Sequence, residues 1–266
     1  MQSDRHAAVV VLPLARAVRS PAVPEVDVIA RGAVAEAEAA EAAEVLGRVV
    51  ARYRSVAGAR VRLATGECAR GSMLVQVNLR VCGAPARIQV IAGVYEALAI
   101  AAARLDRQVA RLSDRWESWP WPDPQRPPLT YISEAGIARH KNIRLRQATP
   151  CQAGAVMDAM DYDVHIFTDT TTGEEAIVYR AGPAGLRLAR QHRVHPPAQT
   201  AGAAITVNPH RTLILTPRRG ADRVNRHGLP FLFFTDPTSA RGNLLYRRYD
   251  GALTLVTPAH AETTRA

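Results

Sequence analysis

The sequence predicts an α+β protein: a front domain of β-α-β-β-β-α order, followed by two small helix-and-hairpin modules that form an intrachain pseudo-dimer. Two observations lead to this architecture. In the first half of the chain, two long helical patterns enclose three short runs of extended character. In the second half, a stretch that starts at Thr149 recurs 67 residues later, from Thr216. A unit this small often cannot bury its apolar face alone, so the two copies are expected to pack together.

The front domain is expected over residues 23–116, after an N-terminal extension of residues 1–22. Its predicted elements are a strand at Glu25–Ile29, a helix at Ala33–Arg54, strands at Ala59–Ala64, Met73–Val81 and Pro85–Ile91, and a helix from Val94 to Trp116. The first helix is rich in Ala, Glu and Leu, and its arginines follow its glutamates, an order that suits the helix dipole. The second helix carries regularly spaced arginines on its outer face. Both helices are expected to cover one face of the sheet.

A proline-rich linker is expected at residues 117–142. Glu117–Pro128 contains five prolines, which exclude a helix or a central strand and favour a stiff extended segment. Trp116, Trp119 and Trp121 are expected to pack the start of the linker against a domain, with base stacking as the less favoured alternative.

The modules are expected at residues 143–190 and 211–258, separated by a joint at 191–210 and followed by a tail at 259–266. Each contains a Thr-Pro pair, in which the threonine can cap a helix and the proline fits its first position. Two apolar runs divided by a turn then follow, which is the pattern of a β-hairpin. The first module is also expected to open with a strand at Ile143–Arg146.

The two copies differ in charge. Residues 149–190 hold three Arg against six Asp or Glu, a net charge of −3, whereas residues 216–257 hold seven Arg against three Asp, a net charge of +4. Related units of opposite sign are suited to pairing with each other.

The composition of the whole chain favours a polyanionic partner. The 266 residues carry a formal charge of +10, which points to nucleic acid first and to an anionic membrane second. Cys68, Cys82 and Cys151 are widely spaced, which argues against a disulfide framework or a zinc site and for a reducing cytoplasm. The apolar run near the N-terminus is too short to span a bilayer, so a soluble cytoplasmic protein without a membrane partner is expected.

Specific residues in the modules carry a family resemblance. The matching residues of the first copy are Phe167, Thr168, Asp169, Thr172, Gly173, Glu174, Val178, Tyr179, Arg180, Gly185 and Leu186, and those of the second are Tyr246, Arg247, Arg248, Asp250, Gly251 and Leu253. They resemble the hairpin motif and the Y-R-R-x-D-G ending of the C-terminal module in the long-form ribosome hibernation-promoting factor family. The β-α-β-β-β-α order ahead of a proline-rich linker is similar to that family's N-terminal ribosome-binding domain. Two such modules in one chain depart from the family pattern.

The resemblance implies that the front domain lies in the mRNA and tRNA channel of the small ribosomal subunit, against rRNA. The expected rRNA-binding residues are Arg48, Arg52, Arg54, Arg80, Arg87, Arg104, Arg107, Arg111 and Arg115. RNA helices are recognised through their phosphates and shape, which asks for spaced cations on a rigid surface. For any single arginine, a solvated surface charge is an alternative of equal weight.

The resemblance also implies a pairing role for the modules, because the family's C-terminal module dimerises and joins two ribosomes. A partner tethered in the same chain acts at an effective concentration of order millimolar, so intrachain pairing is expected to win. The expected pairing residues are Phe167, Val178, Tyr179, Phe234 and Tyr246. Such a factor would keep single ribosomes inactive during dormancy or hypoxic stress, without a cofactor, a metal or a small-molecule substrate.

Two other classes of protein remain open. A metal-assisted enzyme could use the cluster of Asp158, Asp161, Asp163 and His165, although aspartates are also favoured at helix-to-strand turns for their local hydrogen bonds. A metal site at His192, His195 and His210 is less favoured than solvated loop histidines. A regulator that docks other proteins through the modules, without RNA, is the second alternative.

Overall fold

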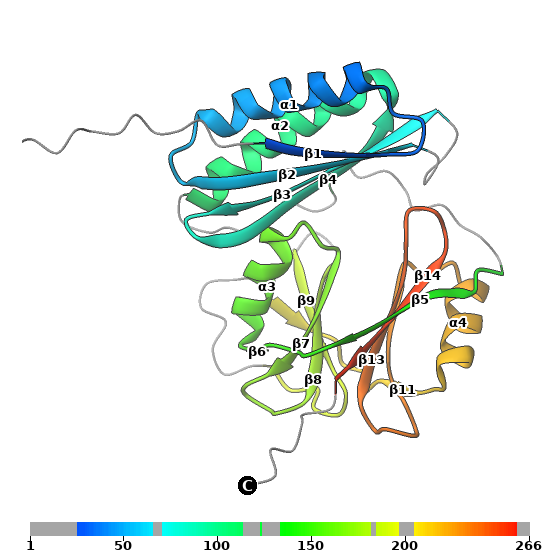
Figure 1. Ribbon diagram of the computed structural model, residues 1–266. Helices are drawn as coiled ribbons and strands as arrows, with labels where there is room; N and C mark the ends of the chain where they lie inside the picture. Colours follow the sequence, from blue (N-terminus) through cyan, green and yellow to red (C-terminus); the bar gives the residue numbers. More distant parts are fainter. Residues whose placement is uncertain are drawn as a thin grey trace, which may run out of the picture.

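The structure is a computed structural model that describes residues 26–65, 71–113, 123, 134–181, 185–196 and 205–259. Across these residues the chain forms three sheets and four α-helices (Figure 1). The four-stranded sheet with its two long helices lies above, and the two five-stranded sheets lie side by side below it. No helix in this described part is long and apolar enough to cross a membrane.

The N-terminal domain has the β-α-β-β-β-α order that the sequence predicts. Its elements are β1 (Val26–Arg31), α1 (Glu36–Ala51), β2 (Val56–Thr65), β3 (Ser72–Val81), β4 (Ala84–Gly93) and α2 (Val94–Ser113). The sheet order is β1-β2-β3-β4, in which β1 runs parallel to β2 and the other pairs are antiparallel. Both helices lie on one face of this sheet (Figure 1), which confirms the predicted layers.

The core of this domain follows from the alternation of β3 and the apolar stripe of α2. Met73, Val75 and Val77 point from β3 into the core, where they meet Leu105 and Val109 of α2. Side chains on β3 and β4 that alternate with these core positions, such as Gln76 and Gln89, point to the opposite face. That second face of the sheet is turned toward the C-terminal half of the chain (Figure 1).

The two C-terminal modules repeat the same elements, and the helix and the three longer strands of the second begin 67 residues after those of the first. The first contains β6 (Gln147–Ala148), α3 (Pro150–Ala159), β7 (Val164–Asp169), β8 (Glu175–Arg180) and β9 (Leu186–Arg190). The second contains β11 (Leu213–Ile214), α4 (Pro217–Arg226), β12 (Phe231–Thr235), β13 (Gly242–Arg247) and β14 (Leu253–Pro258). Thr149 and Thr216 cap the two helices, accepting hydrogen bonds from the backbone N–H of Gln152 at 3.3 Å and of Arg219 at 3.4 Å.

Each module completes its sheet with a strand that comes from outside its own stretch of chain. The strand β5 (Ile137–Ile143) precedes the first module, yet it pairs in parallel with β14 of the second. The strand β10 (Ile205–Val207) precedes the second module, yet it pairs in parallel with β9 of the first. The modules therefore exchange strands. The sequence instead predicted that a strand at Ile143–Arg146 would open the first module, where only β6 is formed.

The two module sheets pack against each other through one apolar cluster. Its buried members are Ile166, Ile177 and Ala189 from the first module and Phe233, Leu244 and Val256 from the second. Tyr179 meets Phe231 edge to face across this contact, with ring centroids 5.3 Å apart. Glu175 of the first module also forms an ion pair with Arg241 of the second. The negative partner thus comes from the module with net negative charge and the positive partner from the module with net positive charge.

Close approach of the two sheets depends on a glycine in β13. A Cβ atom placed on Gly242 would lie 2.8 Å from both the Cβ of Glu175 and the ring of Phe233. No larger residue fits there without moving the sheets apart.

Candidate nucleic-acid interface

Four of the arginines expected to bind rRNA are exposed on or next to the two long helices. Arg48 lies in the last turn of α1, and Arg107 lies on the outer face of α2. Arg52 and Arg54 follow directly after α1, because this helix ends at Ala51 and not at Arg54 as predicted. The end of α1 lies next to this part of α2, as the ion pair between Arg52 and Asp106 at 2.9 Å shows. Together they form a basic edge of the N-terminal domain, which we call the helical arginine group.

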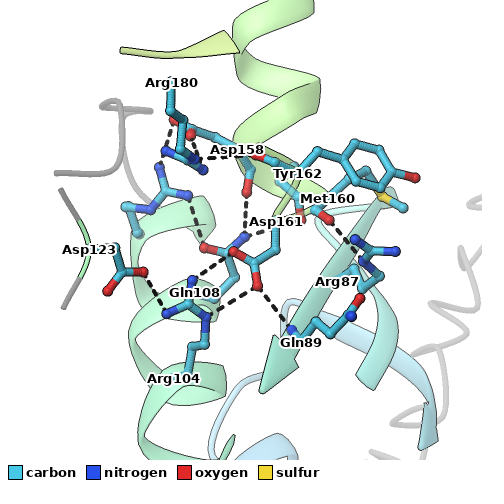
Figure 2. Close-up of polar contacts among 12 residues, drawn as sticks. Arg87, Gln89, Arg104, Gln108, Asp123, Asp158, Met160, Asp161, Tyr162 and Arg180 are labelled. Atoms are coloured by element: carbon cyan, nitrogen blue, oxygen red, sulfur yellow. Dashed lines mark hydrogen bonds and ion pairs between the residues drawn. The ribbon is translucent and has the colours of Figure 1, made fainter. Parts of the chain in front are cut away.

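The other expected rRNA-binding residues occupy different environments. Arg80 is exposed at the end of β3 and donates to the carbonyl of Gly83, and Arg87 is half-buried on β4. Arg115 lies outside the described residues. Arg104 and Arg111 are placed on α2 but face the first module. Arg104 forms an ion pair with Asp161 (Figure 2), and Arg111 forms one with Asp158.

Arg104 is buried between three segments of the chain, and only 2% of it is exposed. It donates from Nη2 to Asp161 Oδ1 at 2.8 Å, from Nε to Asp161 Oδ2 at 3.2 Å and from Nη1 to Asp123 Oδ2 at 2.8 Å (Figure 2). Burial opposes the charged form, but hydrogen bonds and charges from the two aspartates outweigh it and raise the pKa of Arg104 above its ordinary value. Arg104 therefore remains a cation that is compensated inside the protein.

Asp161 belongs to a turn that joins α3 to β7. We call residues 158–163 the acidic turn. Besides Arg104, Asp161 accepts a hydrogen bond at 2.9 Å from the backbone N–H of Gln89 on β4, the edge strand of the N-terminal sheet (Figure 2). The carboxylate thus satisfies both an edge-strand donor and a buried guanidinium.

The rest of the acidic turn docks on the same side of α2 and β4. Gln108 donates to the backbone carbonyls of Asp158 at 2.8 Å and Ala159 at 3.1 Å, and Arg87 donates to the carbonyl of Met160 at 2.9 Å. The Arg87 guanidinium also lies 4.5 Å from the ring centroid of Tyr162, within the range of a cation–π contact.

Asp158 links this docking contact to the interior of the first module. Its carboxylate lies 2.7 Å from Arg180 of β8 and 3.5 Å from Arg111 of α2. Burial lowers the pKa of Arg111, as does the positive charge of Arg180, while Asp158 partly offsets both effects.

The second module provides an internal comparison for the acidic turn. At the positions of Asp158 and Asp161 it has Asn225 and Gly228. Asn225 Nδ2 donates to the carbonyl of Ala135, just before β5, at 2.9 Å, and Asn225 Oδ1 accepts from Arg247 at 3.1 Å, so it holds the sheet that contains β5 together. Both turns place this residue in the left-handed region, with φ of 53° at Asp161 and 61° at Gly228. Since this left-handed conformation favours glycine, the aspartate is held there at some cost in strain.

The geometry of the acidic residues differs from that of a catalytic or metal site. Asp158 and Asp161 face arginines of α2, and His165 stacks on Tyr162 with ring centroids 6.1 Å apart. Within the described ranges, no group of three or more His, Cys, Asp or Glu residues is placed to hold a metal ion. Asp158 and Asp161, two members of the cluster that suggested an enzyme, instead contact the N-terminal domain.

A cleft of about 460 Å³ lies between the second face of the N-terminal sheet and the two modules. Cations and tyrosines line it, among them Arg62, Arg87, Lys141, Arg248, Tyr162 and Tyr246. Lys141 donates to the Tyr246 hydroxyl at 2.7 Å. The docked acidic turn forms one wall of this cleft, so the cleft belongs to the docked arrangement.

Among the five residues expected to pair the modules, the structure brings two to the contact between the sheets. Tyr179 and Tyr246 pack against the shared apolar cluster. Phe167 and Val178 lie in the separate core of the first module, and Phe234 lies in that of the second. Successive strand residues face opposite sides, so each of these three points toward its own helix while its neighbour points across the contact.

Sequence reasoning missed the partners of the docked surface. Gln89, Gln108 and Asp123 are single polar residues without a motif, and none of them could be found from spacing alone. A signal did exist for the acidic turn, because two acidic residues replace the asparagine and glycine of the second copy at positions that are otherwise equivalent.

His165 makes the stability of the first module depend on pH. Burial, with a smaller contribution from the charge of Arg146, lowers the pKa of His165 from 6.5 to about 4. Between pH 6.5 and about 4 the unfolded chain carries a proton on His165 that the folded chain does not. The free energy of unfolding is therefore highest above pH 6.5 and decreases as the pH falls toward 4. We expect His165→Gln to remove up to about 3 kcal/mol of this loss, measured by urea unfolding at several pH values. His192 is exposed, so His192→Gln serves as the control and should show the same change in free energy of unfolding with pH as the wild type. If His165→Gln also shows the wild-type change, His165 is not the group responsible.

Comparison with known proteins identifies the class to which this arrangement belongs. A family model described as "Sigma 54 modulation/S30EA ribosomal protein C terminus" matches residues 133–188, which contain β5 and most of the first module. A solved structure of a ribosomal subunit interface protein from Coxiella burnetii covers 32% of this chain and 93% of that chain, at 12% identity and a TM-score of 0.26, a likeness too slight to support a conclusion.

Two curated relatives cover nearly the whole chain. Both are named "Dormancy associated translation inhibitor", from Mycobacterium tuberculosis strains CDC 1551 / Oshkosh and ATCC 25618 / H37Rv. Each is 50% identical over 242 residues, which covers 88% of this chain and 89% of the relative. The chain belongs to the ribosome hibernation factor family, in the branch of the dormancy-associated translation inhibitors.

Proposed function

We propose that this protein is a ribosome-associated translation inhibitor of dormant cells, which acts in the cytoplasm by occupying the mRNA and tRNA channel of the small subunit. The observation that carries the proposal is the helical arginine group, which presents exposed arginines from α2, from the last turn of α1 and from the turn directly after α1. The family membership and the names of the relatives supply the ribosome as the partner and inhibition as the outcome.

The helical arginine group has the chemistry that rRNA requires. Phosphates carry most of the affinity in RNA recognition, and arginine forms bidentate hydrogen bonds to them. Arg52 is held at the α1–α2 contact by Asp106. Arg48 and Arg107 lie within α1 and α2, whereas Arg52 and Arg54 follow directly after the end of α1. The acidic first half of α1 lies at the other end of the helix, away from this group.

We further propose that the protein holds single ribosomes. The modules exchange strands and share an apolar cluster within one chain, so among the described residues each module already has a partner to pair with. Within one chain the local concentration of each module for the other is of order millimolar, far above that of a second molecule.

Co-sedimentation of the full chain with small subunits tests the first proposal. Binding should weaken steeply between low and moderate salt, because the bound protein displaces counterions from rRNA phosphates. The double variant Arg54→Glu/Arg107→Glu should bind much more weakly and show a salt slope smaller by about two. Arg218→Glu/Arg219→Glu in α4 makes the same change in charge on exposed residues of the second module and should bind as wild type.

The outcomes separate the parts of the proposal. Equal binding by the two double variants would exclude the helical arginine group as the rRNA contact. Sucrose gradients of intact ribosomes with the added wild-type protein test whether the protein holds single ribosomes. We expect a dominant single-ribosome peak. A dominant ribosome-dimer peak would refute intrachain pairing of the modules on the ribosome.

A further inference from the structure

We propose that the acidic turn occupies part of the rRNA-binding surface of the N-terminal domain, so that the protein must open before α2 and β4 can meet RNA. This inference rests on the proposed function and concerns the regulation of the same surface. The docked arrangement is then a closed, latent form.

The overlap between the two uses of this surface is direct. Arg87, Arg104 and Arg111 are three of the nine arginines expected to bind rRNA. Each is engaged by the acidic turn: Arg87 by the carbonyl of Met160, Arg104 by Asp161, and Arg111 by Asp158. A phosphate cannot reach Arg104 while it remains buried in the docked arrangement.

The contacts made by the acidic turn are ones that RNA can replace. The Asp161 carboxylate accepts from both Nη2 and Nε of Arg104, and a phosphate diester offers two oxygens to the same guanidinium fork. The carboxylate therefore stands where a phosphate oxygen would lie. A polar contact of this kind is exchangeable, because water or RNA can satisfy its donors once the two parts separate.

The N-terminal domain does not need the docked module for its core. Its apolar core is built from residues of β1–β4, α1 and α2 alone, without a contribution from either module. Twenty residues lie between Ser113 and Glu134, and a chain of that length can span up to about 65 Å. The two parts can therefore separate without loss of either core.

Divergence of the two modules shows that docking is a specific property of the first. The second module keeps the same turn with Asn225 and Gly228, so the fold requires neither Asp158 nor Asp161. An aspartate at a left-handed position, where the second module has glycine, points to a use for its carboxylate.

The test transfers the residues of the second turn to the first. The double variant Asp158→Asn/Asp161→Gly removes both docking carboxylates while it keeps residues that this backbone accepts. Asp222→Asn/Asp236→Asn removes the same charge from the second module and serves as the control. Hydrogen exchange at the Gln89 amide, which donates to Asp161, reports docking in the free protein. It should be faster in the first variant and unchanged in the control.

Association with small subunits at matched salt then tests the consequence. We expect the Asp158→Asn/Asp161→Gly variant to bind about tenfold more tightly than the control, because it need not open first. Binding equal to or weaker than that of the control, with faster exchange at Gln89, would overturn the closed form and leave the proposed function intact. Absence of binding by wild type, control and variant alike would overturn the proposed function itself.

Discussion

Replacing Arg104 with methionine is expected to separate the N-terminal domain from the first module. The change leaves the carboxylates of Asp161 and Asp123 buried without the guanidinium that compensates them. Removal of one partner from a buried ion pair destabilises the structure that contains it by about 3–5 kcal/mol. Because the two cores are separate, this loss should destabilise the docked arrangement and not the folding of either part. Small-angle scattering of Arg104→Met should show an expanded particle, while the helical content by circular dichroism stays near that of wild type.

The control for this experiment lies one helical turn further along α2. Arg107 is exposed, and Arg107→Met should leave both the scattering profile and the exchange of the Gln89 amide unchanged. A compact particle for Arg104→Met would show that the ion pairs do not hold the two parts together. Loss of helical content would show that the N-terminal domain depends on Arg104 for its own folding.

Replacing Phe233 with aspartate is expected to break the packing between the two modules. Phe233 is 8% exposed and lies in the apolar cluster that both sheets share. The change removes a large apolar side chain and buries a charge, so we expect a loss of at least about 4 kcal/mol in the free energy of unfolding of the modules. Urea unfolding followed by tyrosine fluorescence measures the effect.

Ile214 supplies the matched control, since it is an apolar residue of the same sheet that is 69% exposed. Ile214→Asp should change stability by less than about 0.5 kcal/mol. If the modules pair within one chain, the midpoint of wild-type unfolding should also be independent of protein concentration. A midpoint that rises with concentration would instead show pairing between chains.

The sequence was sufficient to predict the order of elements and the repeat, because both depend on local patterns. Alternation along β3 and helical periodicity along α2 each report which face of one element is apolar. The sequence could not tell Phe233 from Phe234 as the pairing residue. Both faces of the module sheets are buried, one against a helix and one against the other sheet, so alternation gave no preference.

Two other features were beyond local patterns. The strand β5 has the same character whichever sheet it joins, and only the three-dimensional arrangement assigns it to the second module. Arg104 was predicted to face outward from its own domain, but what lies outside that domain is the acidic turn. Helical spacing describes a residue's orientation within one domain and carries no information about a second domain that packs there.

The position of β5 also constrains how the protein is made. Its partner β14 ends at Pro258, so the sheet of the second module closes only after the residues up to Pro258 have left the ribosome that synthesises them. Thr257, for example, donates to the carbonyl of Lys141, 116 residues earlier. Contacts between such distant residues form late and slowly. A chain terminated before β14 would leave β5 without its partner, so it would lack the closed sheet of the second module of this inhibitor.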